Sequence, residues 1–85
     1  MIDFSKNFIP FMAMLEEANI PHEVVWCTDN GMKIIFPDGS DVALNPYTYG
    51  HEQGKLEGYN GKFKNEFDDV IGYLNARQAF EILTK

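Results

Sequence analysis

The chain has 85 residues, of which 45% are hydrophobic, 14% aromatic and 24% charged, and its net charge is −6. This composition is typical of one globular domain, residues 1–85, and excludes both a disordered chain and, with Cys27 as the single cysteine, a disulfide-stapled scaffold. Lysine and arginine are too few to neutralise a row of phosphates, and no apolar run approaches the roughly 20 residues of a membrane span, so we expect a cytoplasmic protein that binds neither nucleic acid nor membranes directly.

The first predicted element is a helix near the N-terminus. Asn7 is a favoured N-cap residue, and its side-chain oxygen is expected to accept a backbone N–H of the first turn. Asn19 suits the left-handed position that ends a helix, and Ile20-Pro21 prevents its continuation. The buried face is defined by residues at helical spacing: Phe8, Phe11, Met12 and Leu15.

Two β-forming runs, 22–27 and 32–36, flank Asn30-Gly31, which is the strongest short-range signal of a hairpin. A two-residue loop at Asn30-Gly31 places Cys27 opposite Ile34 and Val25 opposite Phe36. These four residues and Met32 are expected to share the apolar face, with Cys27 as a small core residue. The other face is expected to be mixed and to carry Val24, Trp26, Thr28, Lys33 and Ile35.

Pro37-Asp38-Gly39 predicts a second turn. A two-residue loop would set Val42 opposite Ile35, whereas a three-residue loop with Gly39 left-handed sets Val42 opposite Ile34. The second register keeps the apolar residues on one face and is therefore preferred. It produces a three-stranded antiparallel meander.

The remainder of the chain predicts a glycine-rich loop over 45–64, with a short strand at 56–59, and a further strand at 70–73. Asn75 and Gln78 form a capping-box pattern before a final helix. That helix is expected to bury Ala76, Ala79, Phe80 and Leu83. The predicted fold class is α+β, with both helices on one face of the sheet.

Candidate reaction chemistry is sparse. His51 beside Glu52 in the glycine-rich loop is the one pair suited to acid–base catalysis, but no serine or second cysteine stands in a known motif to be activated, and a solvated loop histidine is the simpler interpretation. The histidines and cysteine lack zinc spacing, and Asp38-Gly39-Ser40-Asp41 is too short for a calcium loop. We therefore expect no catalytic residue, metal or cofactor.

Surface residues of the second half suit a protein partner instead. Tyrosines beside carboxylates provide rigid contact area with a polar tip, which is typical of protein-binding surfaces. The alternative is that these tyrosines pack over the edge of a small core. The predicted partner-binding residues are Tyr47, Tyr49, His51, Glu52, Glu57, Tyr59, Glu66, Asp68 and Asp69.

Two segments carry a resemblance. VALNPYTYGHEQGKLEGY at 42–59 and DVIGYLNARQAFEIL at 69–83 resemble short uncharacterised proteins of phages and prophages of Gram-positive bacteria. The shared features are a Tyr-Gly-x-Glu-x-Gly loop and a Gly-Tyr-Leu run before a capped helix. The resemblance implies a bacterial or viral cytoplasmic setting and assigns no activity to any residue.

Three functional hypotheses follow. The first is a non-enzymatic protein-binding domain whose partner is a basic nucleic-acid-binding protein such as a host defence nuclease. The second is a homo-oligomer, for instance a homodimer, in which another copy covers Trp26, Val24 and Ile35. The third is a small hydrolase-type enzyme that uses His51 with Glu52.

Overall fold

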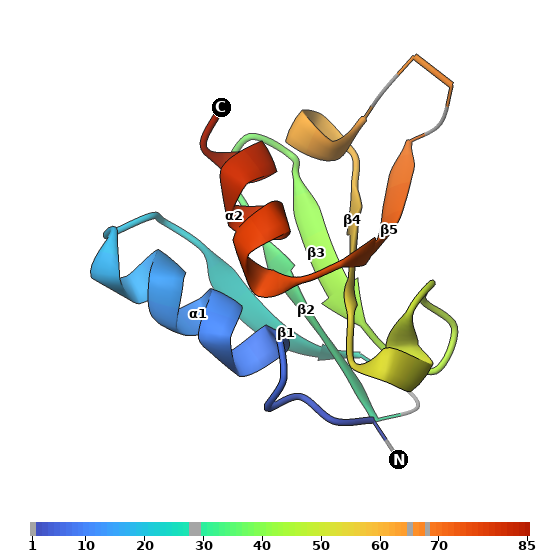
Figure 1. The fold of residues 1–85 in the computed structure, drawn as a ribbon. Coiled ribbons are helices and arrows are strands. Elements are labelled where there is room, and N and C mark those ends of the chain that lie inside the picture. The colour runs from blue at the N-terminus through green and yellow to red at the C-terminus, as the bar shows by residue number, and fades with distance from the viewer. Residues whose placement is uncertain (1, 28–29, 65, 68) are drawn as a thin grey trace.

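The computed structural model describes residues 2–27, 30–64, 66–67 and 69–85, with only the backbone of Cys27. The fold is α+β, as predicted: an N-terminal helix, five antiparallel strands that lie in the sheet in chain order, and a C-terminal helix (Figure 1). The elements are α1 Phe8–Glu17, β1 Glu23–Cys27, β2 Gly31–Ile35, β3 Asp41–Leu44, the 3-10 turn η1 His51–Gln53, β4 Leu56–Tyr59, the 3-10 turn η2 Gly61–Phe63, β5 Val70–Leu74 and α2 Ala76–Leu83.

One hydrophobic core lies between the two helices and one face of the sheet. The helices lie side by side on that face (Figure 1), and Phe80 of α2 packs against the core from their side. Burial of these side chains supplies most of the favourable free energy of folding. The core consists of Phe8, Phe11, Leu15, Ile34, Phe36, Val42, Leu44, Leu56, Phe63, Leu74, Ala76, Ala79 and Leu83.

The predicted helix ends are confirmed at two places. Asn19 has a φ of 56°, and the N–H groups of Asn19 and Ile20 donate to the carbonyls of Glu16 and Leu15, which closes α1 in a Schellman motif. At the start of α2, Asn75 and Gln78 form the reciprocal capping box, at 2.8 and 2.9 Å. Both predictions depend on contacts within a few residues.

The predicted role of Asn7 is wrong. Its side chain makes no cap hydrogen bond to α1. Its Nδ2 donates to the carbonyl of Gly54 at 3.0 Å, and its Oδ1 accepts from the N–H of Ala76 at 3.1 Å. Asn7 therefore joins α1 to the end of η1 and satisfies a free N–H at the start of the other helix.

The predicted register of the first hairpin is also wrong. Cys27 pairs with Gly31, Val25 with Lys33 and Val24 with Ile34, so three residues, 28–30, join the strands. Of these three residues the structure describes only Asn30, whose φ is 61°. Gly31 lies within β2, where a side chain has no room because a Cβ there would lie 2.2 Å from the Asn45 Cβ. The glycine thus serves a close approach to β3 rather than the turn.

This register redistributes the first two strands between the faces. Val24 and Trp26 pair with Ile34 and Met32 and so lie on the helix side, whereas Ile35 lies on the opposite side. The predicted mixed face that joins Val24 and Trp26 to Ile35 is therefore wrong. The side chains of Cys27 and Thr28 lie outside the described residues.

The second hairpin agrees with the prediction. Val42 pairs with Ile34 and Leu44 with Met32, and Gly39 has a φ of 92° in the three-residue loop. The strands expected at 56–59 and 70–73 are also present, the second extending to Leu74. They complete the five-stranded meander.

The face of the sheet away from the helices has no second layer among the described residues. A row of side chains crosses all five strands on this face, namely Glu23, Ile35, Asp41, Tyr59 and Val70. Partial burial in this row raises the pKa of the Asp41 carboxyl, although Lys33 nearby acts in the opposite direction.

Candidate functional site

A pocket of about 250 Å³ lies where the turn between β3 and β4 meets β5. Residues 47–53 form most of its lining, and Tyr73 of β5 completes it. Three tyrosines therefore surround one small hollow, although Tyr73 lies more than 20 residues further along the chain than Tyr47 and Tyr49.

These tyrosines are the most exposed aromatic residues of the pocket region. Tyr47 is 78% exposed, Tyr49 60% and Tyr73 56%. Patches of exposed aromatic surface mark interaction sites in many proteins, and tyrosine is enriched at the centres of protein-binding surfaces. Each of these three tyrosines is therefore more than half exposed and is not packed in this domain's own core.

The turn that carries Tyr47 and Tyr49 is fixed by its own polar side chains. Asn45 Oδ1 accepts the N–H of Tyr47 at 2.8 Å. The buried hydroxyl of Thr48 accepts from the Asn45 N–H at 3.1 Å and donates to the Asn45 carbonyl at 3.0 Å. The backbone from Asn45 to Thr48, which carries Tyr47, is therefore fixed by hydrogen bonds within the turn.

Tyr49 is also held by the neighbouring strands. Its N–H donates to Glu57 Oε2 at 2.9 Å, and its carbonyl accepts from the N–H of Tyr73 at 3.3 Å. The Cβ of Tyr49 lies over Gly72, where an added Cβ would come within 2.5 Å of it. The turn is thus docked against β4 and β5, and glycine at position 72 is required for this approach.

Tyr73 is placed by an irregularity in the last strand pair. Leu56 pairs with Leu74 and Gly58 with Ile71, so two residues of β5, Gly72 and Tyr73, face one residue of β4. Tyr73 takes a left-handed φ of 58°, which is costly for an aromatic residue. This bulge keeps both Ile71 and Leu74 directed to the core while Tyr73 projects beside the pocket.

The turn itself holds the ring of His51. Its Nδ1 lies 2.7 Å from the carbonyl of Thr48. Because a carbonyl only accepts, Nδ1 carries the proton in the neutral ring and Nε2 keeps its lone pair. Among the described residues, no group of three or more His, Cys, Asp or Glu side chains is arranged to hold a metal ion.

The charges around the pocket are mixed. Glu52 is exposed at the pocket and has no hydrogen-bond or ion-pair partner among the described residues. The Cβ of Lys55 lies next to Gly50, since an added Cβ there would be 3.0 Å away. The tyrosines, rather than a surplus of carboxylates, are what distinguish this surface.

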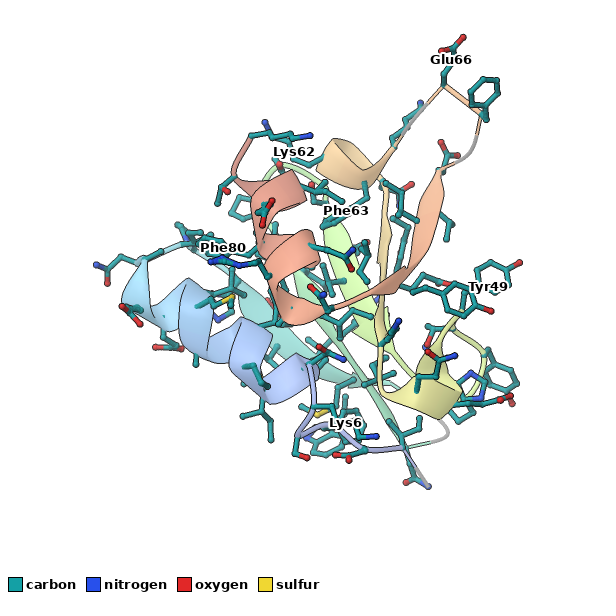
Figure 2. The ribbon with its side chains drawn as sticks, in the orientation of Figure 1. Lys6, Tyr49, Lys62, Phe63, Glu66 and Phe80 are labelled. Atoms are coloured by element: carbon teal, nitrogen blue, oxygen red, sulfur yellow. The ribbon has the colours of Figure 1, made fainter. Side chains whose placement is uncertain are left out.

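The structure brings together only some of the predicted partner-binding residues. Tyr47, Tyr49, His51 and Glu52 line the pocket, and Glu57 contacts it through the Tyr49 N–H. The others belong to the opposite end of the β4–β5 hairpin, as the positions of Tyr49 and Glu66 show (Figure 2). They are Tyr59, Glu66 and Asp69, while Asp68 lies outside the described residues.

Tyr73 is the one pocket tyrosine that is not among the predicted partner-binding residues, and Thr48, Gly50 and Gln53 are not among them either. Its position in a run of β-forming residues indicates only a strand, and the approach of β5 to the 47–53 turn depends on the bulge. An aromatic residue directly after Gly72 was the available signal, because glycine within a strand marks bulges.

Comparison with protein-family models, curated proteins and solved structures finds no match to this chain. In the part of the chain that the structure describes, neither helix combines the length and the apolar composition needed to cross a bilayer.

Proposed function

We propose that this protein is a non-enzymatic binding domain that engages a protein partner through the tyrosine pocket, defined as residues 47–53 with Tyr73. The observation that carries the proposal is the convergence of three exposed tyrosines on one hollow from two distant segments. Tyrosine loses little conformational entropy when it is immobilised and offers both an apolar ring and a hydroxyl.

Rigid presentation supports the same proposal. Hydrogen bonds of Asn45 and Thr48 fix the turn, and Glu57 and Tyr73 hold Tyr49 from two sides. A surface that is already ordered before binding loses less entropy when the complex forms. The strained backbone of Tyr73 is also more readily understood if its side chain is needed at this position.

The partner we propose is a basic nucleic-acid-binding protein, such as a host defence nuclease, in a bacterial cytoplasm. The net charge of −6 would attract a cationic partner and accelerate encounter. The resemblance to short phage and prophage proteins supports this setting. Electrostatic attraction supplies the steering in this proposal, and the tyrosines supply the short-range contacts.

The test begins with the partner that co-purifies from a bacterial host, followed by affinity measurements with purified proteins. We expect Tyr49→Ser and Tyr73→Ser each to weaken binding by about tenfold or more, because tyrosines that a partner buries at an interface are common hot spots. Phe67→Ser is the matched control, since Phe67 is 91% exposed and lies beyond the opposite end of the β4–β5 hairpin. Undiminished affinity in both tyrosine variants would reject the pocket as the binding surface.

A second comparison separates local from global charge. Glu52→Gln and Glu66→Gln change the net charge equally, but only Glu52 lies at the pocket. We expect Glu52→Gln to weaken binding more, and we expect affinity to fall as salt rises. Affinity that does not change with ionic strength would remove the basic partner from the proposal.

A further inference from the structure

The two edges of the sheet differ in how they are protected. The outer edge of β5 is interrupted by the bulge at Gly72 and Tyr73. By contrast, β1 pairs with β2 in unbroken register over all five of its residues, and its sequence, EVVWC, contains no proline or lysine. Regular edge strands that lack proline, lysine and a bulge are the ones that pair with another chain.

Trp26 makes the β1 edge unusual. It lies on the helix side of the sheet, opposite Met32, yet 75% of it is exposed. A tryptophan buries about 150 to 250 Å² when it is covered, so this is the largest single apolar area that the edge leaves in water.

We infer that β1 pairs with β1 of a second copy of this chain, antiparallel about a two-fold axis at Val25. This register places Val24 opposite the partner's Trp26 and Glu23 opposite the partner's Cys27. The strand is self-complementary in this arrangement because its one charged residue faces an uncharged one. Each Trp26 then covers a β-branched residue of the other copy on the helix side.

The size of the contact indicates a weak dimer. A five-residue strand pair with two tryptophans falls at or below the roughly 1,200 Å² of a small specific interface. We therefore expect a dissociation constant on the order of 10 to 100 µM. The tyrosine pocket, at the β5 edge, remains open in this dimer, so the inference does not depend on the proposed function.

The chain carries its own probe for this contact, because Trp26 is its one tryptophan. As the protein concentration rises from about 1 to 500 µM, a range that spans the expected dissociation constant, we expect a blue shift of the Trp26 emission together with a dimer in sedimentation velocity. A monomer at the highest concentration, with unchanged emission, would overturn the inference.

Two variants locate the interface. Val25→Glu places a carboxylate opposite Lys33 within each monomer, which is favourable, but opposite the same carboxylate of the other copy at the two-fold axis. We expect it to weaken the dimer by about fivefold or more, so that the blue shift of the Trp26 emission moves to correspondingly higher protein concentration. Val25→Thr, which keeps a neutral β-branched residue, is the matched control and should dimerise like the wild type.

Trp26→Thr removes the main apolar contact and should weaken the dimer by about tenfold or more. Tyr73→Thr, at the other edge of the sheet, should leave the dimer unchanged. A dimer that withstands both Val25→Glu and Trp26→Thr would place the interface elsewhere and refute the inference.

Discussion

Substitution of Asn7 tests whether this residue, which the sequence predicts to cap α1, stabilises the fold by linking two distant segments instead. Its amide connects the Gly54 carbonyl and the Ala76 N–H, which are 47 and 69 residues away in sequence. Each hydrogen bond is worth about 0.5 to 1.5 kcal/mol net, so Asn7→Ala should lower the free energy of unfolding by about 1 to 3 kcal/mol. That is a large share of the roughly 4 to 13 kcal/mol expected for a chain of this length.

Serine separates the two roles. Serine replaces asparagine well at a helix N-cap, but its side chain is too short to reach both Gly54 and Ala76. We therefore expect Asn7→Ser to be about as destabilising as Asn7→Ala. Asn75 is the matched control, because it caps its own helix through the Gln78 N–H, and Asn75→Ser should be nearly neutral.

Urea unfolding followed by circular dichroism measures these differences. With a slope of about 1 to 1.5 kcal/mol per molar urea, the expected loss at Asn7 moves the midpoint by about 0.7 to 3 M. If Asn7→Ser unfolds within about 0.3 kcal/mol of the wild type, the bridge contributes nothing beyond ordinary capping, and the reasoning fails.

Two other outcomes follow from backbone strain and from partial burial of charge. Tyr73→Asn should raise the free energy of unfolding by about 1 kcal/mol, because asparagine tolerates the φ of 58° better than tyrosine does. The same substitution should weaken partner binding. Tyr47→Asn is the control, because Tyr47 has no positive φ and its substitution should bring no gain in stability. Asp41→Asn should stabilise the protein at neutral pH. Burial raises the pKa of Asp41 in the folded state, so its ionised form opposes folding above that pKa, and the difference from wild type should close as pH falls toward the ordinary value of 3.8. Urea unfolding at several pH values checks the Asp41 outcome, and a constant difference across pH would contradict it.

The features that the sequence predicted correctly are those whose partners lie nearby in the chain. The Pro37-Asp38-Gly39 turn sets its own register through Gly39, and the Asn75 capping box is complete within four residues. The alternation of apolar residues then selects the face of β3 and β4. For such signals, tertiary contacts reinforce the local preference.

The features that were mispredicted depend on distant contacts. Asn7 is used by two segments remote in sequence, and Gly31 is required by the side chain of Asn45 rather than by a turn. In the pocket, Tyr47, Tyr49, His51 and Glu52 were among the predicted binding residues, but Tyr73 was not, since its position follows from one extra residue in β5. Local propensity does not contain this information.

The meander has a consequence for the order in which the protein forms during synthesis. Every strand pairs with its neighbour in the chain, so each hairpin can assemble soon after it leaves the ribosome. The core, however, also requires α2, which contacts α1 and buries Ala79 and Leu83. Until α2 emerges, the nascent sheet keeps its apolar side unsealed, and this interval is when chaperones or premature aggregation would compete with folding.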